Sequence, residues 1–144
     1  MAITGFSPNA NDARTYTLPY FGVTVSTVTT AAAVTYTPAQ VLGGLILRDP
    51  NGAARADLLP TAAALIDALN GPFEGMAFIV TIRNTADAAE AITVTTNTGV
   101  TLSGTMAIAQ NATTRFLVVI TAIRHRQGAT ADAVTVYSLG TAVH

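Results

Sequence analysis

The chain has 144 residues, of which half are hydrophobic and only 10% are charged, and its formal net charge is −1. Such a balance gives no basic face for nucleic acid. No window holds the roughly 20 consecutive apolar residues of a membrane-spanning helix. The length fits one domain. A small domain this poor in charge would leave apolar surface exposed, so we expect a homo-oligomer.

Two residue types are missing from the sequence. The absence of cysteine excludes disulfides, thiolate chemistry and zinc-ribbon spacing. Lysine is also absent, so all seven basic residues are arginine, the side chain that best holds planar, partly desolvated contacts. A high-GC genome would produce the same bias, and both explanations stay open. The first residues have neither the basic nor the apolar region of a signal peptide, which predicts synthesis and folding in a cytoplasm.

The first half of the chain mixes strand and turn signals. Residues 1–18 are polar and rich in turn formers, so we expect an extended N-terminal arm, with plain disorder as the alternative. A single β domain is expected over 19–144. Strands are indicated over 20–30 and 34–37, where Pro38 would end the second. The apolar run 42–48 predicts a buried strand or bulge before an Asx-type turn at Asp49.

One short α-helix is predicted near residues 61–70, with Thr61 as its N-cap and Asn70-Gly71 before Pro72 as its stop. Further strands are expected over 76–84, 91–96, 100–102, 106–108, 115–123 and 133–137. A hairpin or bulge would join 100–102 to 106–108. The strand over 115–123 is apolar on both faces, which indicates a central strand or one covered by a partner subunit. The spacing predicts a mainly β fold: an antiparallel β-sandwich or a small, jelly-roll-like β-barrel.

Sequence motifs for catalysis are absent. The Gly43-Gly44 pair lacks the spacing and the lysine of a phosphate-binding loop. The acidic residues are scattered, and a glycosidase would need a close carboxylate pair and commonly aromatic platforms, yet there is no tryptophan. Only His125 and His144 could serve as histidine bases. We therefore predict no catalytic, cofactor or metal-binding residues and no enzymatic activity, and keep a small hydrolase using His125 as the weakest alternative.

Several arginine and aromatic residues are candidates for contacts with a partner. Arg124-His125-Arg126 predicts a solvated hairpin tip or a contact loop, with a basic patch for an acidic partner as the alternative. Arg48 and Arg55 could instead form a structural salt-bridge cluster with Asp57. The full set of possible interface residues is Tyr20, Phe21, Arg48, Arg55, Arg124, His125 and Arg126.

Five blocks of sequence carry a resemblance to a known class of protein. They are VLGGLILRDPNGAARAD at 41–57, LPTAA at 59–63, IRNTADAAE at 82–90, GTMAIAQN at 104–111 and VTVYSLG at 134–140. Together they resemble small virion structural proteins of tailed bacteriophages, of the capsid-decoration (cement) or head-fibre type, over about 34–141. The resemblance implies a homo-oligomer, often a trimer, on the outer capsid surface of the virion, across the joints between major capsid protein subunits. It implies no catalytic residues.

A second function stays open beside capsid decoration. A tail or head-fibre module that binds host-surface glycans would need exposed aromatic side chains. The plausible ones are Tyr16, Tyr20, Phe21, Tyr36 and Tyr137. Neither function requires direct contact with nucleic acid or a membrane.

Overall fold

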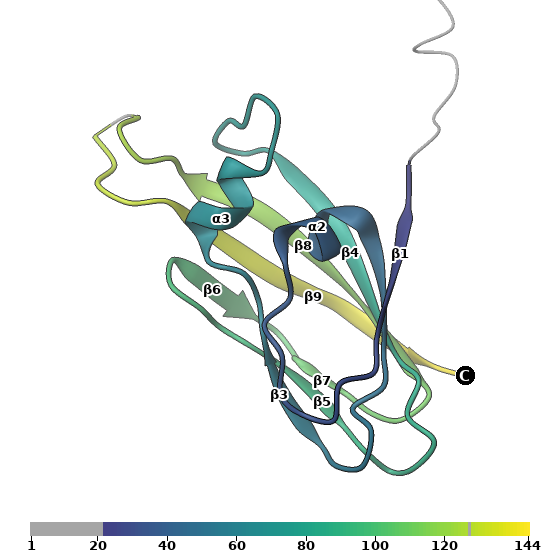
Figure 1. Ribbon diagram of the computed structural model, residues 1–144. Coiled ribbons are helices and arrows are strands. Elements are labelled where there is room, and N and C mark those ends of the chain that lie inside the picture. Colours follow the sequence, from purple (N-terminus) through teal and green to yellow (C-terminus); the bar gives the residue numbers. More distant parts are fainter. Residues whose placement is uncertain (1–21, 127) are drawn as a thin grey trace, which may run out of the picture.

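The computed structural model describes residues 22–126 and 128–144, which are mainly β: 45% of these residues lie in strands and 10% in helices. The strands form two sheets (Figure 1). The larger sheet has six strands in the order β1 (Thr24–Val28), β2 (Gly44–Arg48), β4 (Ala77–Asn84), β8 (Ala112–Ala122), β9 (Ala133–Val143) and β6 (Val100–Ser103). The expected N-terminal arm over 1–18 lies outside the described residues, as do Tyr20 and Phe21.

The smaller sheet has three strands, in the order β3 (Arg55–Leu58), β5 (Ile92–Thr95) and β7 (Ala107–Ile108). The described residues also form two short helices, α2 (Pro38–Gly43) and α3 (Ala62–Asp67). The smaller sheet and both helices lie on one side of the larger sheet in Figure 1. Among the described strands no closed barrel is found, so the barrel alternative is wrong.

The pairing of the strands corrects the antiparallel expectation. In the larger sheet, β1 with β2, β2 with β4, and β6 with β9 run parallel, whereas β4 with β8 and β8 with β9 run antiparallel. In the smaller sheet, β3 and β5 are parallel. Parallel neighbours need long crossover connections, and the chain supplies one between β1 and β2 that contains α2. Composition indicates parallel strands only where they are apolar throughout, and the parallel strands β1, β3 and β6 contain polar residues, so their composition did not reveal their direction.

The predicted helix is confirmed and a second one was missed. Thr61 caps α3 by accepting a hydrogen bond from the backbone N–H of Ala64 (3.1 Å), although the helix ends at Asp67, before the predicted stop. Residues 34–37 do not form the predicted strand. Instead, Thr37 and Gln40 form a reciprocal capping box, and Pro38 begins α2 rather than ending a strand.

The remaining strand predictions fare unevenly. The segment over 115–123 is confirmed as part of a central strand, because β8 lies between β4 and β9. The strands over 100–102 and 106–108 are not a hairpin, since β6 and β7 belong to different sheets. Strand β3 was not predicted at all. Its four residues, Arg-Ala-Asp-Leu, carry two charges, which hides a buried strand from any hydrophobicity pattern.

One cluster of buried apolar side chains draws on both sheets and both helices. Strand β8 contributes Phe116, Val118 and Ile120, and α3 contributes Leu65 and Ile66. The alternation of buried and more exposed residues along β4 and β8 means that only one face of the larger sheet points into this core. The opposite face is called the outer face below.

Candidate interaction surface

The prediction that Arg48 contacts a partner is wrong, because its side chain is completely buried at the end of β2. Its Nε donates to Asp57 Oδ2 at 2.6 Å, and its Nη2 donates to Asp57 Oδ1 at 3.2 Å. This two-point contact is the geometry in which arginine binds a carboxylate most strongly. The structural alternative, a salt bridge between Arg48 and Asp57, is thereby confirmed.

The other guanidinium hydrogens bind backbone carbonyls in the segments that follow β1 and β2. Nη1 donates to the carbonyl oxygens of Thr30 (3.0 Å) and Asp49 (2.5 Å), and Nη2 donates to that of Ala32 (2.7 Å). With the two bonds to Asp57, all five N–H groups of Arg48 have acceptors. A lysine could not make this set of contacts, because it lacks the fixed fork of donors.

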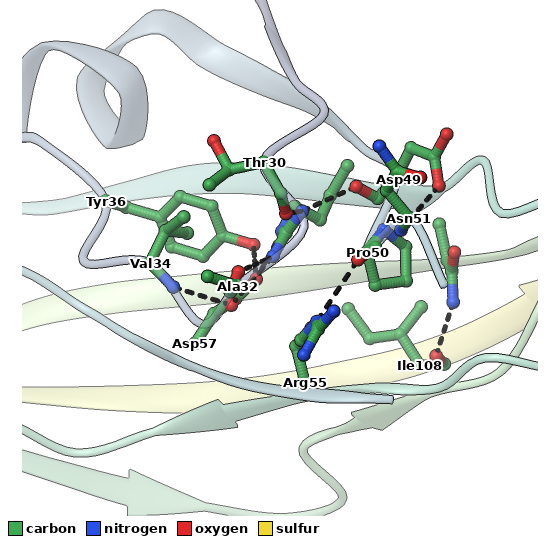
Figure 2. A network of polar contacts seen from close by, with 12 residues as sticks. Thr30, Ala32, Val34, Tyr36, Asp49, Pro50, Asn51, Arg55, Asp57 and Ile108 are labelled. Carbon is green, nitrogen blue, oxygen red and sulfur yellow. Dashed lines mark hydrogen bonds and ion pairs between the residues drawn. The ribbon is translucent and has the colours of Figure 1, made fainter. Parts of the chain in front are cut away.

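The carboxylate of Asp57 is equally satisfied (Figure 2). Besides the two bonds from Arg48, it accepts one from the Tyr36 hydroxyl (2.8 Å) and one from the backbone N–H of Val34 (3.0 Å). Burial, together with the nearby charge and hydrogen bond of Asp57, raises the pKa of Tyr36 above its ordinary value, so the phenol stays a donor. Burial opposes the charge on Arg48, but Asp57 outweighs it and raises the pKa of Arg48.

This buried network, Arg48–Asp57–Tyr36, is a structural clasp. It joins β2 of the larger sheet to β3 of the smaller sheet and ties the 30–36 segment to both. Every donor and acceptor on its two charged groups is used within the chain, so none is available for a ligand. Sequence reasoning placed Tyr36 among the possible sugar-binding aromatics, and its 1% exposure rules that out.

Arg55 does not join the predicted salt-bridge cluster through its Nε, which donates to the Pro50 carbonyl at 3.2 Å. The Asx-type turn predicted at Asp49 is confirmed, since Asp49 Oδ1 accepts the backbone N–H of Asn51 at 2.9 Å. Both contacts shape the loop between β2 and β3 and keep Arg55 half-buried rather than projecting from the surface.

Arg124, His125 and Arg126 are all exposed at a tight turn between β8 and β9, where the backbone N–H of His125 donates to the Ala129 carbonyl. Asp132 braces this turn. Its Oδ1 accepts the backbone N–H of Arg124 at 2.7 Å, and its Oδ2 lies 3.6 Å from Arg124 Nη1. A hollow of about 320 Å³ beside the turn is lined by Thr61, Ala63, Thr98, Arg124, Thr130, Ala131 and Asp132. The described residues include no group of three potential metal ligands.

The outer face of the larger sheet carries an apolar row that sequence reasoning did not single out. Ile79 of β4 pairs in register with Leu117 of β8, which pairs with Tyr137 of β9. Ile79 and Tyr137 are 40% and 41% exposed, which is high for such side chains on a six-stranded sheet. The next row places Ala77 beside Val119.

Beyond this row, the outer face continues over β2 and β1. Leu45 lies beside Val25, which is 54% exposed. Arg83 and Arg115 are the only charged side chains that the described strands direct to this face, and no acidic side chain accompanies them. Leu45 pairs with Thr81, which pairs with Arg115, so this row is apolar on β1 and β2 and polar on β4 and β8. Exposed apolar side chains gathered on one face mark interaction sites. The one sequence signal for it was the strand over 115–123, which is apolar on both faces.

Comparison with known proteins identifies no relatives: no family model, curated protein or solved structure matches the chain. None of the described helices has the length and apolar character needed to cross a membrane.

Proposed function

We propose that this chain is a non-enzymatic structural subunit of a tailed-phage virion, a capsid decoration (cement) protein that self-associates, with a trimer favoured. Its two sheets form a sandwich around the shared core, with the clasp fixing one sheet to the other. In this role the chain binds the outer capsid surface between major capsid protein subunits and stabilises the head. The phage assignment rests on the sequence resemblance.

The observation that carries the packing role is the outer face, with its exposed apolar side chains and its few charges. Four strands at about 4.8 Å spacing, eight residues long in β4, span roughly 20 Å by 25 Å, or about 500 Å² of flat area. Because side chains project from the face, its accessible area is larger than this flat area. It approaches the area that each partner buries in a standard interface, about 800 Å². The interface would desolvate few charges, because only Arg83 and Arg115 lie on it.

The saturated clasp supports the same role. A cement protein must hold one shape while many weak contacts act in parallel. A buried charge pair with every hydrogen bond made favours a single well-ordered arrangement of the two sheets. No part of the clasp is left to bind or transform a substrate.

The test is to locate the chain in purified particles of the phage whose genome encodes it. Heads and tails are separated, and each fraction is analysed by mass spectrometry. The proposal predicts the chain in the head fraction, at a fixed ratio to the major capsid protein, and greater heat stability of heads that carry it. A chain found in tails or fibres, with selective binding on a glycan array, would replace it with the host-glycan alternative.

A further inference from the structure

Two strand edges of the larger sheet are open among the described residues. Strand β1 pairs with β2, and no other described strand lies on its opposite side. Strand β9 pairs with β8 along both of its halves, but β6 covers only residues 134–137 on the other side. The end of β9, residues 139–143, therefore presents a second edge that no described strand covers, on the side of β9 that faces away from β8 and β1 in the strand order.

The backbone hydrogen bonds reveal which groups point outward at each edge. The Val28 carbonyl accepts from Asp49 N–H on the β2 side, so by strand alternation Val25 and Thr27 direct their backbone groups to the open side. Similarly, His144 donates its N–H to Asn111 on the β8 side, which turns the backbone groups of Thr141 and Val143 outward. Each edge thus offers a run of donors and acceptors that have no partner among residues 22–126 and 128–144.

Neither edge has the usual protection against pairing. Natural proteins place charges or proline on exposed edges, yet Thr24–Val28 and Leu139–Val143 contain neither. Their apolar side chains are exposed: Val25 by 54%, Leu139 by 51% and Val143 by 76%. Burying these uncharged segments against one another would cost no charge desolvation.

We propose that β1 of one copy pairs with the Leu139–Val143 segment of β9 in the next copy, so that the larger sheets continue from copy to copy. The inference rests on the self-association in the proposed function and names its contact. Each copy carries both halves of the contact, which makes a second copy the partner that fits both edges. All strands of the larger sheet except β8 run in one direction, so the new pair is parallel.

The size of the contact favours a ring. A strand of five residues is about 17 Å long, and one such pairing alone buries less than the about 800 Å² per partner of a standard interface. A head-to-tail contact uses both edges of every copy, and closing it into a ring doubles the area that each copy buries. A closed trimer leaves no edge of this kind free, whereas a two-fold dimer through β9 alone would leave β1 open.

Cysteine cross-linking tests this contact directly, because the chain has no cysteine of its own. Val25 and Ala142 both lie on the outer face, where their registers connect them to Leu45 and Thr113. Within one copy they are four strand spacings apart, about 19 Å, so a short thiol cross-link between them must join two copies. The V25C/A142C variant, or T27C/A142C if the register differs by two residues, is expected to give a denaturing-gel ladder that ends at the trimer.

Two controls make the result specific. V25C/T141C directs the second thiol to the inner face, since Thr141 pairs with buried Thr114, and is expected to cross-link at least tenfold less. A142C alone should give no cross-link, and a strong dimer band from it would overturn the proposal in favour of two-fold β9 pairing.

A charge placed on the edge gives an independent readout. T27K should weaken self-association at least tenfold, measured by sedimentation across a concentration series, while T93K, at an exposed position of β5 in the smaller sheet, should not. Oligomers that persist in T27K and resist cross-linking in both double variants would overturn the edge contact and leave the proposed function standing. A monomer for the unmodified chain at every concentration would overturn both.

Discussion

Replacing Arg48 by methionine removes the charge from the clasp while keeping an unbranched side chain of similar length. Asp57 would remain buried, with only the Tyr36 hydroxyl and the Val34 N–H as donors. Breaking a buried pair by removing one partner typically costs about 3–5 kcal/mol. The carbonyls of Thr30 and Ala32 belong to exposed residues and that of Asp49 to a half-buried one, so all three can regain water and we add nothing for them. We expect R48M to lower the free energy of unfolding by about 3–5 kcal/mol.

Urea unfolding followed by circular dichroism measures this loss, provided that the slope of the transition is unchanged. Two further variants sharpen the test. R48K keeps the charge but has fewer donors and no fork, so it should lose about 2 kcal/mol. R48M combined with D57L removes the uncompensated charge and should be more stable than R48M alone. A loss below about 1 kcal/mol in R48M, or no recovery in the double variant, would refute the role of the clasp.

Other predictions concern single positions. Folding raises the pKa of Tyr36, so the contribution of this phenol to stability is complete below about pH 10 and falls by about 1.4 kcal/mol per pH unit above that pH. In Y36F, the decrease of the free energy of unfolding at alkaline pH should therefore be less steep. An unchanged slope would contradict this prediction. Gly99 has a φ of +78°, and a Cβ there would lie 2.6 Å from the Asp132 carbonyl oxygen, so G99A should lose about 1–3 kcal/mol in urea unfolding, whereas G128A, with open space around it, should lose less. T61A should lower the free energy of unfolding by about 1 kcal/mol, because it removes the N-cap of α3. Thermal melting at neutral pH measures this loss, and an unchanged midpoint would contradict it.

Much of the β-structure could be predicted where a local run of residues has one clear pattern. The strand over 115–123 is apolar on both faces, and this placed it in the middle of a sheet. The N-cap at Thr61 was legible because capping chemistry is local. Helix α2 was missed although its signal was present: Thr37 with Gln40 three residues later, and Pro38 at the first helical position. There, the β-branched residues before Pro38 outweighed the capping pattern.

The candidate surface was harder to predict, for two physical reasons. Arginine is usually exposed, so Arg48 was expected at an interface, with a salt bridge to Asp57 as the alternative. Only the fold decides between the two, because it buries Arg48 and brings Asp57, nine residues away, to its guanidinium. The apolar row of Ile79, Leu117 and Tyr137 depends on strand order and register, which no local pattern encodes. The exposed tip at His125, in contrast, follows from the local turn.

The central claim is that this chain works by packing against copies of itself through its larger sheet. The most direct test is the mass of the purified chain in solution at micromolar concentration, by light scattering coupled to size-exclusion chromatography. We predict a single species at three times the 14.8 kDa chain mass. A species that stays at 14.8 kDa as the concentration rises would contradict the claim.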